Sequence, residues 1–262
     1  MSSTPTPPEG VVEDDHKFAA WAATVAGELL TELRTRGLEG KELKDAGDQA
    51  SHELLMEILA TYRPDDAVLS EEGKDDKLRL TADRAWIIDP LDGTREFSEP
   101  PRDDWAVHVA LWARDASGGD LVAGAVAQPG LGATFGTGEP PVVPQRSSDR
   151  PRIAVSRTRP PAFVQALAEE IGAELVPMGS AGAKVISVVR DVSDAYVHAG
   201  GQYEWDSAAP VAVARAAGLH TSRIDGSPLV YNQNDVLLPD LVVCRPELAD
   251  PILELIRRHG AE

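Results

Sequence analysis

The chain has 262 residues and a formal net charge of −18, because 43 acidic side chains outnumber 25 basic ones. Its hydrophobic share of 42% and charged share of 26% are typical of a globular protein. No apolar run approaches the ~20 residues of a membrane span. The negative charge disfavours polymeric nucleic acid, which needs a basic surface to displace counterions. We therefore expect a cytoplasmic protein with neither a membrane nor a nucleic-acid partner.

The chain divides into three predicted parts. Residues 1–12 are rich in Pro, Ser and Thr and lack the basic and apolar regions of a secretory signal, which predicts a disordered lead-in. A stretch rich in Gly and Pro, 136–151, predicts a boundary near residue 142. An N-terminal α+β subdomain would then cover 13–142, and a C-terminal α/β subdomain 143–262.

Hydrophobic periodicity predicts mixed helices and strands in the first half of the chain. Helical spacing of apolar residues predicts two helices, 14–35 and 50–62. Short apolar runs predict two strands, 67–71 and 85–88. Two further runs of apolar residues predict an antiparallel pair, 105–112 and 121–128.

The second half repeats this alternation. It predicts strands over 153–156, 195–198 and 241–244, the last ending at a buried structural cysteine, Cys244. It predicts helices over 161–171, 183–189 and 207–217, the last with Pro210 tolerated in its first turn. Helices that alternate with strands in both halves predict sheets covered by helices, in an α/β (α+β layered) fold.

The most informative motif runs from Trp86 to Phe97. A short apolar strand leads into two carboxylates, Asp89 and Asp92, on a corner stiffened by Pro90. Gly93 permits a sharp turn, after which a short helix could point its free N–H groups at the same place. The pattern predicts a site where a cation meets an anion.

This motif has two other interpretations. The same residue types form ordinary surface turns, in which Asp caps the following helix. Hydrolases of the haloacid dehalogenase type also place an Asp pair before Gly-Thr, but their spacing is Asp-x-Asp. The Asp-x-x-Asp spacing from Asp89 to Asp92 argues against that class.

Four carboxylates fall at predicted junctions between elements, namely Glu71, Asp89, Asp92 and Asp206. Gathered together they would repel unless cations neutralised them, and an all-oxygen set suits Mg²⁺ or Mn²⁺. The six histidines form no zinc motif. Asp48 is a candidate base, with the Thr94 hydroxyl as its relay, although helix capping is an equally simple role for Asp48 and for Asp206.

Three segments together resemble the signatures of the inositol monophosphatase superfamily. They are Ser70-Glu71-Glu72, Asp89-Pro90-Leu91-Asp92-Gly93-Thr94 and Trp205-Asp206-Ser207-Ala208-Ala209-Pro210. The resemblance covers residues 15 to 245. It implies a sugar-phosphatase-like αβαβα sandwich of two subdomains, dependence on Mg²⁺, inhibition by Li⁺ and a homodimer. Whether the Ala-rich segment 211–217 forms the dimer surface is left open.

The resemblance also implies roles for individual residues. Glu71, Asp89 and the Leu91 carbonyl would hold one Mg²⁺. Asp89, Asp92 and Asp206 would hold a second, and Glu71 could reach a third, which gives two to three ions per site. Asp48 and Thr94 match the pair that activates water. The predicted substrate contacts are Asp92, Gly93, Thr94, Ser180, Gly182, Lys184 and Asp206.

The second half resembles the nucleotide-phosphatase branch of the superfamily, linked to sulfate assimilation. Lys184 is the cue, since a cation there could pair with a second phosphate. Inositol-specific members carry a Glu where this chain has Ala199, and Glu204 is a candidate substitute from another direction. His198 could touch the nucleotide or simply lie in a strand.

These observations predict a Mg²⁺-dependent 3′(2′),5′-bisphosphate nucleotidase. Its substrates would be 3′-phosphoadenosine 5′-phosphate and the corresponding 5′-phosphosulfate. The alternatives are an inositol-1-monophosphatase or a fructose-1,6-bisphosphatase, and, from another class, a non-catalytic regulator that binds metal and nucleotide.

Overall fold

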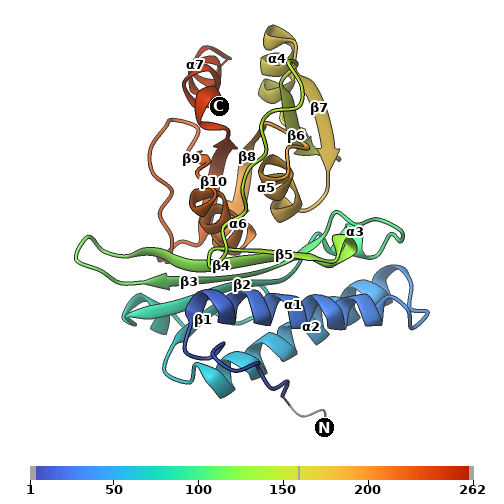
Figure 1. The fold of residues 1–262 in the computed structure, drawn as a ribbon, viewed down its shortest axis with the longest axis vertical. Helices are drawn as coiled ribbons and strands as arrows, with labels where there is room; N and C mark the ends of the chain where they lie inside the picture. Colours follow the sequence, from blue (N-terminus) through green and yellow to red (C-terminus); the bar gives the residue numbers. More distant parts are fainter. Residues whose placement is uncertain (1–3, 159, 260–262) are drawn as a thin grey trace.

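The protein is built in five layers (Figure 1). The structure is a computed structural model that describes residues 4–158 and 160–259. From one end to the other, the layers are a helix pair, a five-stranded sheet, a second helix pair, a second five-stranded sheet and a third helix pair. This confirms the predicted αβαβα sandwich.

The first layer consists of α1 (Asp15–Leu33) and α2 (Gly40–Tyr62). The Asp14 side chain caps α1 by accepting from the amides of His16 and Lys17. Helix α2 begins ten residues before the predicted start at Ala50, because residues 40–49 are mostly polar and show little apolar periodicity. Asp48 therefore lies inside α2, and the alternative that it caps this helix is wrong.

The first sheet has the strand order β1-β2-β3-β4-β5. Its strands are β1 (Ala67–Ser70), β2 (Arg84–Asp92), β3 (Ala106–Ala113), β4 (Asp120–Gln128) and β5 (Ala133–Gly136). Strand β1 is parallel to β2, and the other pairs are antiparallel. The predicted antiparallel pair of β3 and β4 is confirmed, whereas β5 was not predicted.

The second sheet has the order β7-β6-β8-β10-β9. Its strands are β6 (Arg152–Ser156), β7 (Glu174–Met178), β8 (Ala195–Tyr203), β9 (His220–Ser222) and β10 (Leu237–Cys244). Cys244 is fully buried opposite Ala195, as predicted. Strands β7 and β9 were not predicted.

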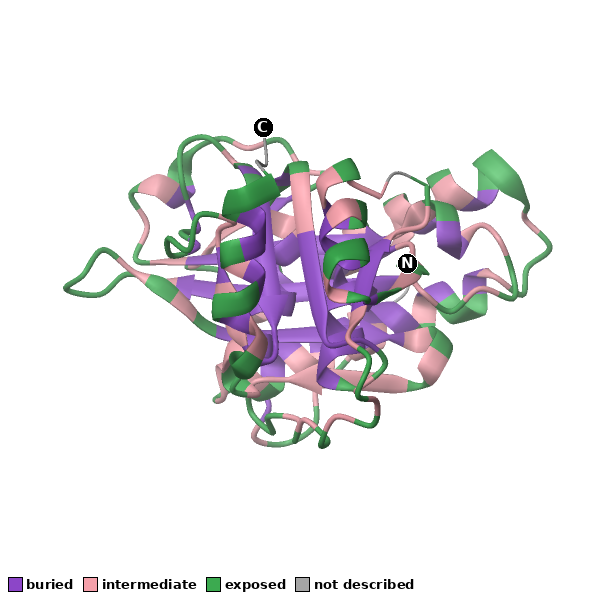
Figure 2. Ribbon diagram, turned by 90° about the horizontal axis from the view of Figure 1, so that it is seen from above, coloured by how far each residue is buried: buried purple, intermediate pink, exposed green. Residues whose placement is uncertain are grey.

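Five further helices complete the fold. They are α3 (Thr94–Phe97), α4 (Ala162–Ile171), α5 (Ala181–Val189), α6 (Glu204–Ala216) and α7 (Ala249–His259). Short 3₁₀ turns occupy Leu78–Leu80, Pro129–Leu131 and Pro246–Leu248. Helices α5 and α6 lie between the two sheets. In Figure 2 the buried residues, in purple, lie mainly in the strands and on the inner faces of the helices.

Helix α6 starts three residues before its predicted beginning. Its N-cap is Tyr203, so Asp206 lies in the first turn and is not the cap. Residues 211–214 of the Ala-rich segment are buried within the chain itself, whereas residues 215–217 are partly or fully exposed. A homodimer and a cytoplasmic location stay predictions. Among the described residues, no helix is long and apolar enough to cross a membrane.

The N-terminal segment differs from its prediction. Residues 4–12 lie against α2, where the Pro5 carbonyl accepts from the Tyr62 hydroxyl at 3.1 Å and the Val12 carbonyl accepts from Arg63 at 2.8 Å. Val11 buries its side chain, which explains why this part of the predicted disordered lead-in is ordered. Residues 1–3 lie outside the described residues. The predicted boundary near residue 142 falls in the segment that connects the two sheets.

A close approach between α2 and α3 brings Asp48 toward the Asp89–Thr94 corner. A Cβ at Gly47 would lie 2.6 Å from the Phe97 ring and 2.9 Å from Leu91. The Ser51 hydroxyl, one turn further on, donates to the Pro90 carbonyl at 2.6 Å. Glycine at position 47 is therefore required by the packing of α2 on this corner.

We expect Gly47→Val to destabilise the protein by about 2 kcal/mol, the typical cost of overpacking a core. Valine and glycine differ by well under about 1 kcal/mol in helix propensity, so the loss reports the steric overlap. Urea unfolding would measure it, with the neighbouring exposed substitution Gln49→Ala as control. An unchanged unfolding midpoint would contradict this account of the packing.

Candidate active site

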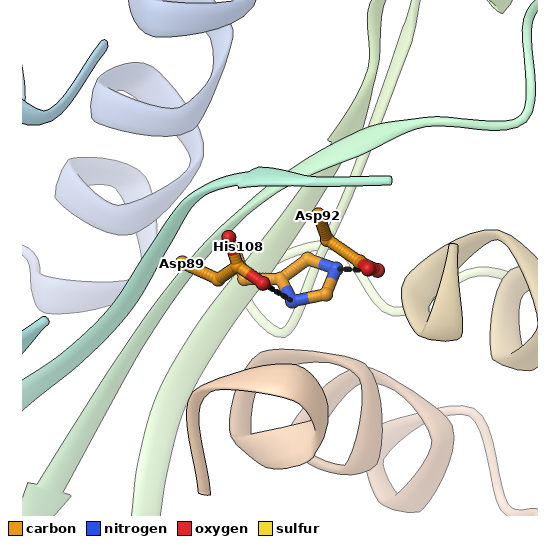
Figure 3. Close-up of side chains that lie close together, drawn as sticks. All are labelled: Asp89, Asp92 and His108. Carbon is orange, nitrogen blue, oxygen red and sulfur yellow. Dashed lines mark ion pairs between the residues drawn. The ribbon is translucent and has the colours of Figure 1, made fainter. Parts of the chain in front are cut away.

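Strand β2 carries both carboxylates of the central motif. The sequence places the end of the strand at Asp89, but β2 continues to Asp92 across a register shift against β3. Pro90 lies in this bulge, where a residue without an N–H costs no ladder hydrogen bond. The bulge brings oxygens of Asp89 and Asp92 and a ring nitrogen of His108 within 4.8 Å of one another (Figure 3).

Asp89 is buried, and one of its oxygens has no partner. Its Oδ1 accepts from the Leu91 amide at 3.0 Å, while Oδ2 has no hydrogen-bond donor among the described residues. Burial, followed by repulsion from Glu71 and Asp92, raises the pKa of Asp89 well above its ordinary value. An unpartnered buried oxygen of this kind requires a proton or a cation.

Asp92 is held from the side of α5. Its Oδ2 accepts from the Ser180 hydroxyl at 2.5 Å and from the Gly182 amide at 2.7 Å, and it lies 3.2 Å from His108 Nε2. Burial opposes ionisation, but the His108 ring and these two hydrogen bonds outweigh it and lower the pKa of Asp92. Asp92 is therefore the carboxylate of the cluster that the protein itself keeps ionised.

Glu71 and Asp206 complete the acidic cluster. Glu71 follows β1, and Asp206 accepts from the Tyr203 amide at 2.6 Å in the first turn of α6. Desolvation, followed by repulsion from Asp206, raises the pKa of Glu71 to about 7. Burial, followed by repulsion from Asp92, raises the pKa of Asp206 to about 6.

These residues fit a hard divalent cation. Carboxylates from the end of β1, from β2 and from α6 converge. Repulsion from Asp206 contributes to the raised pKa of Glu71, and repulsion from Asp92 contributes to the raised pKa of Asp206. A buried Asp89 oxygen has no hydrogen-bond partner among the described residues. A cation would remove the repulsion and supply the missing partner. Oxygen donors of this type suit Mg²⁺, Mn²⁺ or Ca²⁺.

Asp48 and Thr94 are in contact, as the predicted water-activating pair must be. The Thr94 hydroxyl lies 3.1 Å from Asp48 Oδ1 and 3.2 Å from the Leu91 carbonyl. Burial raises the pKa of Asp48 to about 6, and repulsion from Glu72 adds to it. Near neutral pH such a carboxylate is ionised yet basic enough to accept a proton.

Three predicted substrate contacts have partners within the protein. Ser180 caps α5 by accepting from Ala183, and both Ser180 and Gly182 donate to Asp92. Lys184 is only 4% exposed, and its ammonium donates to the Gly179 carbonyl and, at 2.9 Å, to the Ser180 carbonyl. Lys184 therefore does not present its charge to an incoming phosphate, which corrects the expected contact.

Glu204 also has an internal role. Its buried carboxylate accepts from the amides of Asn232 at 2.6 Å and Gln233 at 2.7 Å. It holds this loop and so cannot replace the hydroxyl-binding carboxylate that is missing at Ala199. His198 lies in β8, with Nε2 at 3.3 Å from the Gly201 carbonyl, which fits its interpretation as a strand residue.

Sequence reasoning missed His108. This residue lies in an otherwise apolar run of β3, and no motif marks it. Antiparallel pairing places it directly opposite Asp89, and its side chain is fully buried between Asp89 and Asp92 (Figure 3). A polar residue within the run predicted as strand 105–112 was the signal that could have found it.

Comparison with known proteins identifies the family. The family model described as "Inositol monophosphatase family" matches residues 12–261. The chain belongs to this family. Among family relatives, the 3'-phosphoadenosine 5'-phosphate phosphatase of Mycobacterium leprae (strain TN) is 49% identical over 253 residues, 93% of each chain. The Mycobacterium tuberculosis (strain CDC 1551 / Oshkosh) protein of the same name is 52% identical over 234 residues, 87% of each chain.

A solved structure agrees with the family assignment. CysQ from Bacteroides thetaiotaomicron, described as a bacterial member of the inositol monophosphatase family, superposes with a TM-score of 0.73 at 26% identity. The match covers 87% of this chain and 96% of that one. The resemblance found in the three sequence signatures is thus confirmed, both for the family and for the fold.

The cluster predicts an unusual dependence of stability on pH. Folding raises the pKa values of Glu71 to about 7 and of Asp206 to about 6, so the native state binds protons that the unfolded state has released. Stability therefore falls as pH rises through these values. We expect the metal-free protein to melt several degrees lower at about pH 8 than at about pH 5.5, measured by calorimetry in EDTA.

Mg²⁺ should reverse this trend, because a cation replaces the protons that are lost. The stabilisation by Mg²⁺ should accordingly be larger at the higher pH. Glu71→Gln serves as the matched control, since it removes one titrating group and should flatten the pH dependence in EDTA. A melting temperature of the metal-free protein that rises between these pH values would contradict the proposed cluster electrostatics.

Proposed function

We propose that the protein is a Mg²⁺-dependent phosphatase that removes the 3′-phosphate of 3′-phosphoadenosine 5′-phosphate. One geometric observation carries the hydrolytic part of the proposal. The carboxylates of Asp89 and Asp92 lie next to a contact between Asp48 and Thr94, so a metal site and a proton acceptor share one corner. The phosphatases of M. leprae and M. tuberculosis, about half identical to this chain, support the substrate.

Two to three Mg²⁺ ions are proposed for this corner. Glu71, Asp89 and the Leu91 carbonyl would hold one ion, and Asp89, Asp92 and Asp206 another, with a third within reach of Glu71. When bound, such ions lower the pKa of a coordinated water and offset charge on the phosphoryl oxygens. The unpartnered Asp89 Oδ2 and the mutual repulsion within the cluster support this assignment.

Side chains and backbone amides of the protein would accept the proton and bind the phosphate. Thr94 donates to Asp48, which orients its hydroxyl, and Asp48 accepts the proton of the attacking water. The amides of Gly93 and Thr94 lie at the first turn of α3, where they have no partner within the helix and can bind phosphate oxygens. The new bond joins the water oxygen to phosphorus, the bond to the ribose 3′-oxygen breaks, and that oxygen takes up a proton.

Substrate specificity tests the nucleotide part of the proposal. We expect phosphate release from 3′-phosphoadenosine 5′-phosphate to exceed, in kcat/KM, release from inositol 1-phosphate or fructose 1,6-bisphosphate. Mg²⁺ would be present at saturation, and Asp92→Asn would be the inactive control. A preference for either sugar phosphate would contradict the assignment, and tight nucleotide binding without turnover would favour a regulator.

A second experiment tests the role of Asp48. We expect Asp48→Asn to lower kcat by about 10²–10⁴-fold, the usual contribution of a general base. Because the pKa of Asp48 is raised to about 6, the wild-type rate should fall as the pH drops below this value. At saturating Mg²⁺ the residual rate of Asp48→Asn should lack this acidic limb, and an acidic limb that persists unchanged would exclude Asp48 as the base.

A further inference from the structure

His108 is a fully buried residue in ion-pair contact with Asp92. Its Nε2 makes no hydrogen bond among the described residues, so its contact with Asp92 is one of charge and packing. Nδ1 lies 3.1 Å from the Trp205 carbonyl, just before Asp206, and Nε2 lies 3.2 Å from Asp92 Oδ2. The ring, on β3, thus contacts β2 and the first turn of α6, the two elements that carry Asp89, Asp92 and Asp206. Figure 3 shows the ring between Asp89 and Asp92.

The packing around the ring disfavours a role as a metal ligand, although its nitrogens lie near Asp89 and Asp92. A Cβ on Gly182 would lie only 2.1 Å from His108 Nε2, so the α5 backbone packs directly on that nitrogen. Nδ1 faces the Trp205 carbonyl, which requires a proton on that nitrogen for a hydrogen bond. Neither nitrogen has a free lone pair facing open space, and hard cations of the kind proposed prefer oxygen.

The two oxygens of Asp92 consequently have different roles. Oδ2 accepts hydrogen bonds from the Ser180 hydroxyl and the Gly182 amide and lies 3.2 Å from His108 Nε2, an ion-pair contact without a hydrogen bond. No hydrogen bond to Oδ1 is seen among the described residues. Partners that fix the orientation of a ligating carboxylate contribute to metal affinity although they never touch the metal. Oδ1 is then the oxygen left to bind a cation.

We propose that His108 is a positioning residue that orients Asp92 for metal binding, with Gly182 as the small residue that makes room for its ring. The inference rests on the proposed function only in that it assigns Asp92 to the metal site. It needs no particular substrate, because its readout is metal affinity measured without nucleotide.

The test is a double-mutant cycle read by calorimetric titration of the metal-free protein with Mn²⁺, and then with Mg²⁺. His108→Ala should weaken metal binding about 10–100-fold. Gly182→Ala keeps the amide that donates to Asp92, but its methyl group would displace the His108 ring, so that Nε2 loses its contact with Asp92. It should therefore weaken metal binding to a similar degree. In the His108→Ala background, where the ring is gone, Gly182→Ala should add almost nothing.

Controls separate positioning from loss of fold. Each variant is titrated only below its melting temperature in EDTA, and His220→Ala, a histidine of β9 that contacts Ser222, should bind metal as wild type does. His108→Gln, which retains an amide donor, should recover part of the affinity. Wild-type affinity in His108→Ala, or additive effects of His108→Ala and Gly182→Ala, would overturn the proposal.

Failure of the inference about His108 can be distinguished from failure of the proposed phosphatase function. If the wild-type protein binds metal but hydrolyses no phosphomonoester, the phosphatase assignment fails while the cycle still reports on His108. If the wild-type protein hydrolyses 3′-phosphoadenosine 5′-phosphate and the cycle shows no coupling, the inference about His108 fails alone.

Discussion

Repulsion among neighbouring carboxyl groups is the constraint on which the rest of this structure depends. Asp89 and Asp92 are buried, Asp206 is half-buried, and Glu71 lies at the exposed end of β1, yet each influences the pKa of another member of this set. Bringing such groups out of water and together costs free energy, which the surroundings must offset. The amino ends of α5 and α6 both contribute, since each directs a backbone amide at one of these carboxylates.

The same constraint explains why both halves of the chain are needed for the site. Strands β2 and β3 of the first sheet supply Asp89, Asp92 and His108, while α5 and α6 supply the donors that hold Asp92 and the side chain of Asp206. Helices α5 and α6 form the central layer between the two sheets (Figure 1). The site therefore lies where these helices pack on the first sheet. Neither half alone would orient Asp92.

The sequence predicted the ligand types better than their surroundings. Apolar periodicity predicted sheets covered by helices, and the resemblance to the inositol monophosphatase superfamily implied their arrangement as an αβαβα sandwich. The corner motif pointed to Asp89 and Asp92 because it is a local signal, whereas Glu71 and Asp206 came from two other short segments. His108 escaped detection because its role depends on the register that sets it opposite Asp89, and pairing register is not readable from one strand. Strand β7 is half-exposed and contains Pro177, so its apolar pattern is weak.

Lys184 was expected to contact phosphate because its position matches that of a family residue, but its side-chain conformation does not support this role. A lysine at the start of a helix can extend to solvent or fold back on its own turn, and the sequence is the same in both cases. Here it folds back onto two carbonyls, and its ring contact is Tyr196 at 5.2 Å. Burial lowers the pKa of Lys184, but Asp92 opposes this shift most strongly among its neighbours.

A charge buried beside carboxylates acts on them without touching substrate, because interactions at low dielectric are stronger than those at the surface. The His108 ring, and after it Lys184, oppose the rise in the pKa of Asp206 that burial and Asp92 cause, and so favour the ionised form that binds a cation. Lys184, which resembles a phosphate contact in sequence, thus acts electrostatically on a carboxylate of the proposed metal site.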